Sequence, residues 1–433
     1  MTTVDLAPAD SLGIADAGLT AAHGGRLVRE ALRRGPAAEL LAQARRVHVV
    51  AVGKAAVEMG AAVRSAAGTA FASGVAVPAA PAGPVAGFTV VPGDHPVPGP
   101  GSVRAGLAVQ EYLRGRDFDE RDLVVLAVSG GGSALVSRPS APVGLDDLRS
   151  LTAALLRAGI DVTRINELRK AVSGIHAGAL LPLAGRARLL GLVLSDNVQL
   201  GARAVASGLS YPGSVHFARA AEVLAEVAPA LPPAVVDRVR AAMARRAATA
   251  QGAPAILNVE IGSPRTALDA ALAAARVQGY RAFSLGDGVQ GEAREVARRI
   301  GAAARRLAER TPGPVCLVGA GEVTVSVRGP GRGGRCQELA WAMLPELTGL
   351  PDASFTALAT DGQDFLPGVM GARVTGESLG RAADLGLDWR ALLDRNDTHD
   401  ALSAIGGCLP GRATGTNVCD VYALSWGNGA VPR

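Results

Sequence analysis

The stretch Val47-His-Val-Val-Ala-Val-Gly-Lys54 is a short apolar run that ends in a glycine and a lysine. A valine-rich run of this length predicts a buried strand of a parallel sheet, and the sequence from about Ala55 onward predicts a helix. Such a junction points backbone N–H groups and the positive end of the helix dipole at any anion bound there. Lys54 adds a compact positive charge. The junction is therefore a candidate phosphate site, and a surface lysine on an ordinary turn is the alternative.

Lysine is scarce in this chain, which makes Lys54 more informative. The only other lysine is Lys170, and arginine supplies the remaining positive charge. A lysine that served only solubility would have been replaced under so strong an arginine bias. Both lysines therefore call for a chemical explanation.

Two further apolar runs, 123–128 and 189–194, are each followed by Gly, Ser or Asp and then by helix-forming sequence. This alternation predicts an α/β fold whose N-terminal domain, residues 1–240, is a doubly wound, Rossmann-like parallel sheet. The remainder, residues 241–433, predicts a C-terminal mixed α/β domain. Two β-runs around the glycines of Val318-Gly-Ala-Gly-Glu322 predict an antiparallel hairpin there.

Composition excludes several classes of function. The 433 residues are 48% hydrophobic and only 3% aromatic, and the formal net charge is +5. So few aromatic side chains disfavour base stacking, and the arginines are scattered along helices instead of forming a patch, so we expect no nucleic-acid partner. No apolar run approaches the ~18 residues of a membrane span, and no secretory leader is apparent, which predicts a cytoplasmic protein without a membrane partner. The four cysteines lack metal-ligand spacing and are expected to be reduced thiols.

The segment Ser129-Gly-Gly-Gly-Ser133 directly follows the predicted strand 123–128. Three consecutive glycines between two serines allow the backbone to form a nest of N–H donors, with hydroxyl groups beside it. Ser129, Gly130, Gly131, Gly132 and Ser133 are therefore candidate phosphate-binding residues. A plain tight turn is the alternative.

A second glycine-rich loop, Arg328-Gly-Pro-Gly-Arg-Gly-Gly-Arg335, leads into a predicted helix over 337–344. Arginine binds carboxylate or phosphoryl oxygens with two parallel hydrogen bonds. A flexible loop carrying Arg332 and Arg335 could close over a substrate, whereas a solvated loop is the alternative.

Carboxylates follow several predicted strands, among them Asp196, Asp287, Glu322, Asp361 and Asp364. One or two carboxylates together with substrate phosphates and water are enough to hold Mg²⁺. An Asp-Gly pair after a strand is also a common turn former. The late turn Thr414-Gly-Thr-Asn417 could face a substrate or be structural.

An ammonium group, a glycine nest, an arginine loop and metal-compatible acids are together the components of phosphoryl transfer. In this order they resemble the glycerate 2-kinase family, in which a kinase domain precedes a MOFRL domain. The matching segments are Ala51-Val-Gly-Lys-Ala55, His95-Pro-Val-Pro98, Ser129-Gly-Gly-Gly-Ser-Ala-Leu135, Ile165-Asn-Glu-Leu-Arg-Lys170, Ser195-Asp196, Ala206-Ser-Gly208, Gly291-Glu-Ala-Arg-Glu-Val296, Arg328 to Glu338, Thr360-Asp-Gly362 and Thr414-Gly-Thr-Asn-Val418.

The resemblance implies phosphorylation of the 2-hydroxyl of D-glycerate by ATP with Mg²⁺. The roles that it implies are as follows: Lys54, Arg335 and Asp196 catalytic; Ser129 to Ser133 binding nucleotide phosphates; Arg332, Lys170 and Asn417 binding the acceptor; Asp361 and Asp196 binding the metal. A homodimer is expected only because such assemblies are common.

The chain departs from the family pattern mainly at polar positions. Ala171 and His176 stand where the family usually has His and Lys, Cys336 stands where it has Asn, and no acid follows Asn197 closely. Lost polar contacts change selectivity strongly. Two alternatives therefore remain open: a kinase for another hydroxylated metabolite, and a nucleotide-binding protein without activity. An NAD(P)-linked hydroxyacid reductase is a third, although the glycine fingerprint and ribose-binding acid are missing.

Overall fold

The structure is a computed structural model that describes residues 10–213, 215–249 and 254–427. The chain divides into two compact units. The parallel-sheet unit contains Gly24–Asp196 and Leu200–Ile261, and the mixed-sheet unit contains the residues up to His23, Asn197–Gln199 and the residues from Gly262.

The parallel-sheet unit is built on a six-stranded sheet of order β3-β2-β1-β4-β5-β6. Its strands are β1 (Arg46–Val52), β2 (Phe71–Val77), β3 (Phe88–Val90), β4 (Asp122–Val128), β5 (Arg188–Leu194) and β6 (Leu257–Gly262). The pairs β3–β2, β2–β1, β1–β4 and β4–β5 are parallel. Every residue of β4 is buried, as expected for a strand covered on both faces. The predicted doubly wound sheet is confirmed.

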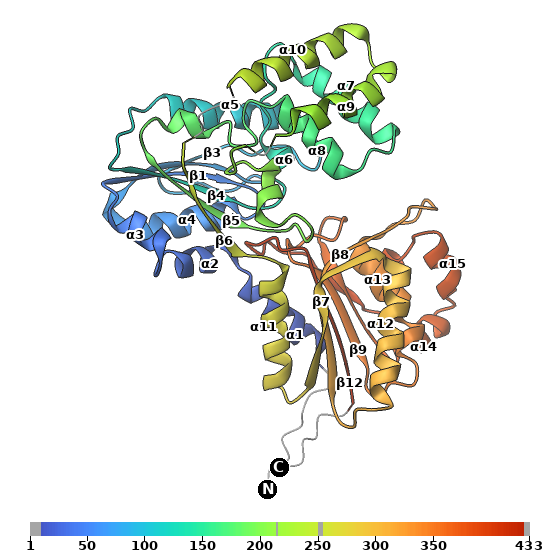
Figure 1. Cartoon of the computed structure of the whole chain (residues 1–433). Coiled ribbons are helices and arrows are strands. Elements are labelled where there is room, and N and C mark those ends of the chain that lie inside the picture. The colour runs from blue at the N-terminus through green and yellow to red at the C-terminus, as the bar shows by residue number, and fades with distance from the viewer. Residues whose placement is uncertain (1–9, 214, 250–253, 428–433) are drawn as a thin grey trace. The chain divides into compact units, whose positions relative to one another are not determined.

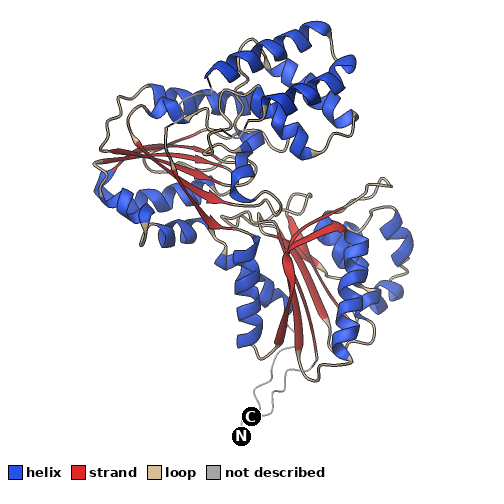
Figure 2. Ribbon diagram, in the orientation of Figure 1, coloured by secondary structure: helices blue, strands red, loops and turns tan. Residues whose placement is uncertain are grey.

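Helices lie on both faces of this sheet (Figures 1 and 2). They are α2 (Gly24–Ala31), α3 (Pro36–Ala42), α4 (Ala56–Ala67), α5 (Pro100–Arg114) and the short α6 (Gly132–Leu135). A helical group with its own hydrophobic core follows, made of α7 (Leu145–Arg157), α8 (Val162–Ala171), α9 (Phe217–Val227) and α10 (Pro233–Thr249).

The mixed-sheet unit has a six-stranded sheet of order β11-β10-β9-β12-β8-β7. Its strands are β7 (Arg281–Glu292), β8 (Val315–Thr324), β9 (Ser354–Ala359), β10 (Val369–Thr375), β11 (Cys408–Pro410) and β12 (Asp420–Trp426). Only the β7–β8 pair is parallel, and the other four pairs are antiparallel. The expected mixed α/β class is confirmed.

Two helices, α1 (Ser11–Ala21) and α11 (Pro264–Val277), cover one face of this second sheet, and α12 (Ala293–Ala308) and α13 (Arg335–Met343) cover the other (Figure 1). The short helices α14 (Ser378–Asp384), α15 (Trp389–Asp394) and α16 (His399–Ala404) complete the unit.

The boundary between the units differs from the expected division at residue 240: besides the short stretch Asn197–Gln199, one helix and one strand belong to the other unit. Helix α1 belongs to the mixed-sheet unit, where the Ser11 hydroxyl is 2.8 Å from the Ser354 hydroxyl and 2.7 Å from that of Thr356. Strand β6 instead extends the parallel sheet beside β5. Both differences arise from pairings between distant segments, which local sequence patterns do not encode.

The expected hairpin around Gly319 and Gly321 is wrong, because β8 runs without interruption through both glycines. At Gly321 φ is +148°, and a Cβ there would lie 2.3 Å from the carbonyl oxygen of Val289 on β7. The glycine thus permits a close approach between neighbouring strands and does not form a turn.

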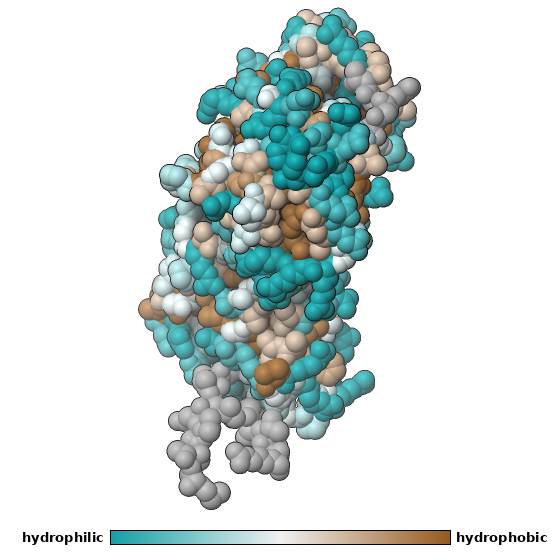
Figure 3. Space-filling model, turned by 90° about the vertical axis from the view of Figure 1, so that its left-hand side faces the viewer, coloured by the Kyte–Doolittle hydropathy of each residue, from teal (hydrophilic) through white to brown (hydrophobic). Residues whose placement is uncertain are grey.

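On the face that Figure 3 shows, hydrophobic residues form small patches among hydrophilic ones. Large exposed hydrophobic side chains, such as Leu156 and Val277, are a normal feature of protein surfaces when they occur singly. Among the described helices, none has the length and apolar character needed to cross a bilayer.

Candidate active site

The carboxyl ends of β1 and β4 form the topological switch point of the parallel sheet. From β1 the chain builds outward through β2 and β3, and then returns to place β4 on the other side of β1. In open α/β sheets, ligands bind in the crevice at such a point. Gly53-Lys54 leaves the sheet at the end of β1, and Ser129–Ser133 leaves it at the end of β4. Two candidate phosphate-binding segments, predicted separately, are therefore neighbours.

Hydrogen bonds join these two segments directly. The N–H of Lys54 donates to the carbonyl of Gly130 at 3.0 Å, and the N–H of Ala55 donates to the Ser129 hydroxyl at 3.0 Å. Ser129 itself is completely buried. Its hydroxyl thus holds the start of α4 in place, a positioning role that differs from the direct phosphate contact expected of it.

The glycine turn retains unused backbone donors. In the described part of the chain, no protein group accepts a hydrogen bond from the N–H groups of Gly130, Gly131, Gly132 or Ser133. Gly131 has φ +83°, a left-handed conformation that glycine adopts without strain. A run of backbone donors at the edge of a parallel sheet fits the phosphate groups of a nucleotide.

Two side chains lie beside this turn. A Cβ on Gly131 would come within 3.2 Å of the His95 ring and 3.4 Å of Cγ of Lys54, so both pack against the glycine. The hydroxyl of Ser133 is 2.8 Å from that of Ser207. Segments following β1, β3, β4 and β5 thus meet at one place and bring a lysine, an imidazole and two hydroxyl groups to the turn.

Replacement of Gly53 by alanine is expected to disrupt this junction. Gly53 has φ +126°, and a Cβ would lie 2.2 Å from the Ser129 hydroxyl oxygen and 2.5 Å from the Ser129 carbonyl oxygen. Strain and collision together are expected to lower the free energy of unfolding by about 3 kcal/mol, measured by urea denaturation followed by circular dichroism. The control is Gly35→Ala, where φ is also positive, at +78°, but no atom lies within 4 Å. Equal destabilisation by the two variants would contradict the close-contact explanation.

Asp196 follows β5, the strand next to β4, and so lies at the same edge of the sheet as Lys54 and the glycine turn. Lys170 lies near the end of α8, where it is 8% exposed and its Nζ is 3.7 Å from Oε1 of Glu167. Lys170 is thus a buried, carboxylate-paired lysine. Its expected contact with the acceptor stays a prediction.

His176 is buried beside the glycine turn, where it contacts the backbone of Gly132 and its Nδ1 is 3.0 Å from the Ser173 hydroxyl. Burial, reinforced by the charges of Arg169 and Lys170, lowers the pKa of His176 to about 3. The ring is therefore neutral in the folded protein at physiological pH.

This lowered pKa predicts acid sensitivity. Between about pH 6.5 and pH 3 the unfolded chain binds a proton at His176 that the folded chain does not, so lowering the pH favours unfolding. The contribution is about 1.4 kcal/mol for each pH unit in that window. His176→Gln is expected to flatten the dependence of unfolding free energy on pH between 6 and 4. His216→Gln, at an exposed position, should leave the dependence unchanged, and an equal effect of both variants would contradict this assignment.

In the mixed-sheet unit, Arg335 begins α13 and binds Asp420 at the start of β12. Its Nε and Nη2 donate to the two carboxylate oxygens at 2.7 and 2.6 Å, and its Nη1 is 3.6 Å from Oε1 of Glu322. Asp420 is completely buried and also accepts the Tyr422 hydroxyl at 3.1 Å. Burial alone would lower the pKa of Arg335, but the charge and hydrogen bonds of Asp420 outweigh it and raise the pKa. Two nitrogens of the guanidinium, Nε and Nη2, are thus held by Asp420, and the third, Nη1, lies toward Glu322.

The first turn of α13 is held by a second buried acid. The carboxylate of Asp364 accepts N–H groups of Cys336 at 3.1 Å and Gln337 at 2.9 Å, and the Gln337 side-chain amide at 3.0 Å. Burial raises the pKa of Asp364, although the hydrogen bonds from Cys336 and Gln337 act to lower it. Asp364 is therefore a helix cap that positions Arg335, not a metal ligand.

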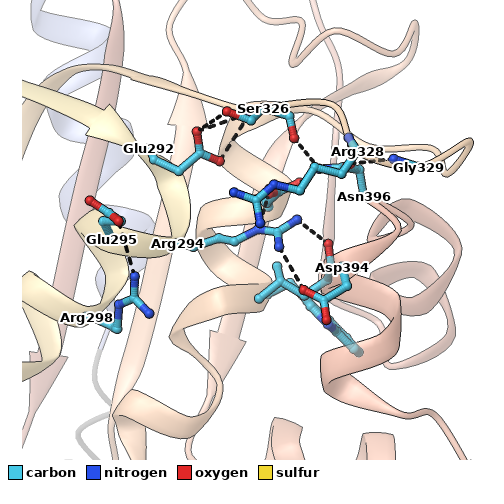
Figure 4. A network of polar contacts seen from close by, with 12 residues as sticks. Glu292, Arg294, Glu295, Arg298, Ser326, Arg328, Gly329, Asp394 and Asn396 are labelled. Carbon is cyan, nitrogen blue, oxygen red and sulfur yellow. Dashed lines mark hydrogen bonds and ion pairs between the residues drawn. The ribbon is translucent and has the colours of Figure 1, made fainter.

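The arginine loop is anchored, contrary to the expectation of a flexible loop. The side-chain oxygen of Asn396 accepts hydrogen bonds from the N–H groups of Arg328 at 2.7 Å and Gly329 at 3.2 Å (Figure 4). Nδ2 of Asn396 donates to Glu338 at 2.9 Å. Arg332 is 62% exposed, with Nη1 3.6 Å from an Asp400 carboxylate oxygen. Of the two candidate site arginines in this loop, Arg335 is held in place and Arg332 is exposed.

The two carboxylates expected to bind the metal, Asp196 and Asp361, follow strands of different sheets. Asp361 accepts the N–H of Gln363 at 3.1 Å, the hydrogen bond of a turn-forming aspartate, and Asn417 is 6% exposed in the turn before β12. Asp196 and Asp361 belong to different units. Among the described residues, no group of three or more His, Cys, Asp or Glu side chains could hold a metal ion. A Mg²⁺ bound mainly through phosphate oxygens and water needs no such group.

Several residues at these sites were missed from sequence. Asp420 and Asn396 stand in no glycine-rich or acidic pattern that the sequence analysis singled out. Asp420 comes two residues after the quoted Thr414 to Val418 segment, and this proximity was its one available indication.

These two α/β units, with a phosphate-type site at the switch point and a carboxylate-bound arginine at the start of a helix, define a phosphotransferase-like α/β protein. Comparisons with known proteins identify it further. The model described as "Domain of unknown function (DUF4147)" matches residues 10–240, and that of the MOFRL family matches residues 315–420.

Among relatives, a protein of Agrobacterium vitis named "Putative hydroxypyruvate reductase" is 34% identical over 314 residues, which cover 71% of this chain and 81% of that protein. The glycerate kinase of Homo sapiens is 33% identical over 372 residues, which cover 75% of this chain and 70% of that protein. The crystal structure of glycerate kinase from Thermotoga maritima has a TM-score of 0.83 at 30% identity and covers 96% of this chain and 98% of that one.

The chain belongs to the glycerate kinase family, in which a DUF4147 domain is combined with a MOFRL domain. This confirms the resemblance and the class of phosphotransferases with an alcohol acceptor. The match to a solved glycerate kinase also confirms the two-domain α/β fold.

Proposed function

We propose that this protein transfers the γ-phosphoryl group of ATP to the 2-hydroxyl of D-glycerate. The observation that carries the proposal is the junction of Lys54 with the glycine turn at the switch point of the parallel sheet, where the Lys54 N–H to Gly130 carbonyl distance is 3.0 Å. Backbone N–H groups without a described protein acceptor, in a turn next to a lysine, suit a polyphosphate. The glycerate kinases among the relatives support D-glycerate as the acceptor.

In this proposal the N–H groups of Gly130 to Ser133 bind phosphate oxygens. Lys54 stabilises the negative charge that develops during transfer, and Arg335 contributes through Nη1. Arg332, Lys170 and Asn417 are proposed to contact the acceptor. Mg²⁺, proposed to be held by Asp196 or Asp361 together with phosphate oxygens, supplies charge neutralisation when bound.

The test is steady-state ATP turnover with Mg²⁺ over a panel of acceptors: D-glycerate, L-glycerate, lactate, glycerol, several sugars and several nucleosides. Turnover that depends on D-glycerate supports the proposal. Turnover with a different acceptor alone would make this a repurposed kinase, and ATP binding without turnover would make it a non-catalytic binding protein.

The reductase name carried by one relative defines the second candidate. A dinucleotide site of the Rossmann type needs a glycine fingerprint after the first strand and an acid near the end of the second strand for the ribose. Here Lys54 follows Gly53, and Pro78 follows β2. Oxidation of NADH or NADPH by hydroxypyruvate is therefore expected not to exceed a protein-free control, and reproducible turnover would overturn this preference.

Action in the cytoplasm and assembly as a homodimer stay predictions. Cell fractionation and light scattering after size-exclusion chromatography are the direct tests. All four cysteines are free thiols in the structure, as the sequence predicted.

A further inference from the structure

The segment Ala206-Ser-Gly208, which follows β5, has an unusual backbone conformation. Its three residues have φ values of +48°, +52° and +70°. Glycine adopts positive φ without cost, whereas alanine and serine are strained there. Backbone strain persists where the surrounding structure holds it, and it is concentrated at functional sites. The strain at Ala206 and Ser207 therefore calls for an explanation from the contacts that these residues make.

This positive-φ segment, residues 206–208, packs directly against the glycine turn. A Cβ on Gly132 would lie 2.5 Å from Cβ of Ala206. The segment is also held from the other side, because the carbonyl of Ser207 accepts the N–H of Ala177 at 3.1 Å. The strained conformation is thus fixed between the glycine turn and the chain near Ala177.

The side chain of Ser207 is directed at the turn. Its hydroxyl oxygen is 2.8 Å from the hydroxyl oxygen of Ser133. Ser207 is completely buried, whereas Ser133 is partly exposed. Among the described residues, the Ser133 hydroxyl is the one hydrogen-bond partner of the Ser207 hydroxyl.

The burial of Ser207 determines which of the two hydroxyl groups donates. A hydroxyl has one hydrogen to donate and two lone pairs that accept. If Ser133 were the donor, the hydrogen of Ser207 would be buried without an acceptor, which is costly. Ser207 is therefore the donor and Ser133 the acceptor. The hydrogen of the Ser133 hydroxyl is thus left for a group outside the protein.

We propose that Ser207 is a positioning residue that directs the Ser133 hydroxyl to donate to a phosphate oxygen of ATP. This inference rests on the proposed function, and it gives a role to a residue for which the sequence indicated none. The oriented hydroxyl adds a side-chain donor to the backbone N–H groups of the turn, and a donor fixed in advance loses less freedom on binding. A carboxylate of the acceptor is the alternative partner for this hydrogen, and the experiment separates the two.

The experiment is a double-mutant cycle of Ser207→Ala and Ser133→Ala, with the dissociation constant of ATP measured by calorimetry in the presence of Mg²⁺ and without acceptor. Each single variant is expected to bind ATP roughly 3- to 10-fold more weakly, the range for one uncharged hydrogen bond. Because Ser207 acts through Ser133, the double variant should bind ATP no more weakly than Ser133→Ala alone. Losses that multiply in the double variant would overturn the inference. So would unchanged ATP affinity in Ser207→Ala, with or without a raised KM for D-glycerate.

A second substitution, Ser207→Gly, distinguishes orientation of the hydroxyl from a structural role. Glycine relieves the strain of positive φ, so the thermal midpoint of this variant should exceed that of Ser207→Ala. Its ATP affinity should nevertheless be as low, because both variants lack the hydroxyl. The control is Ala177→Gly, at a buried position with the same φ of +52°. It keeps the N–H that Ser207 accepts, and its ATP affinity should stay within about twofold of the wild type.

Wild-type ATP affinity in Ser207→Gly would overturn the inference, and so would an equal loss of ATP affinity in Ala177→Gly. Either result would assign the effect to the backbone and not to the hydroxyl. Failure of the proposed function is distinguishable from these results. A wild type that binds ATP without phosphorylating D-glycerate would refute the proposed acceptor alone, whereas a wild type that binds no ATP would refute both.

Discussion

Lys54→Met is expected to lower kcat for phosphorylation by about 10³-fold, within the range found when one preorganised charge or donor is removed from a transition state. The side chain of Lys54 packs through its Cγ against Gly131 of the glycine turn, where phosphate oxygens would bind. Because its charge matters most as negative charge develops, kcat should fall far more than the KM for ATP rises. Steady-state kinetics measure both.

The composition provides a direct control for this variant. Lys54 and Lys170 are the only lysines in the chain, so amine-specific labelling read by mass spectrometry reports on two side chains besides the N-terminal amine. ATP is expected to protect Lys54 against labelling. A fall in kcat of less than tenfold in Lys54→Met, with no protection of Lys54 by ATP, would remove the lysine from the site.

Arg335→Ala is expected to damage both stability and activity. It leaves the Asp420 carboxylate, which is completely buried, with only uncharged side-chain donors among the described residues, the Tyr422 hydroxyl and the Cys336 thiol. Removing one partner of a buried ion pair costs about 3–5 kcal/mol. If Arg335 stabilises the transferring phosphoryl charge as proposed, its loss should also lower kcat by roughly 10³-fold or more.

The three tryptophans, Trp341, Trp389 and Trp426, all lie in the mixed-sheet unit, so fluorescence during urea denaturation reports on the unit that contains Arg335. The double variant Arg335→Ala/Asp420→Asn should recover part of the lost stability, because it removes the uncompensated charge. It should not recover activity. Recovery of activity in the double variant would show that Arg335 serves only to neutralise Asp420.

The parallel-sheet unit was largely predictable because its determinants are local. The runs that became β1, β4 and β5 are short and continuously apolar, and each ends in the residues that now occupy the functional edge of the sheet. Lys54 and the turn from Ser129 to Ser133 were identified for the same reason. Parallel strands necessarily bring such ends to one edge.

The mixed-sheet unit was harder to predict because its determinants are distant in sequence. Asp420 precedes Val421 like any acid before a strand, and only the pairing of β12 with β8 and β9 brings it to Arg335, 85 positions earlier. The role of Asn396 is likewise apparent only from the structure, where its side chain binds the backbone of the arginine loop. The sequence predicted a turn at Gly321, but this residue lies within β8, where the absence of a side chain leaves room for the backbone of β7.

The most direct test of the central claim is the chemical identity of the product. Wild-type protein with ATP, Mg²⁺ and D-glycerate should yield ADP and D-2-phosphoglycerate in equal amounts, as resolved by ¹H–³¹P correlation NMR. ADP formation without phosphoglycerate, or phosphorylation of the 3-hydroxyl instead, would contradict the account.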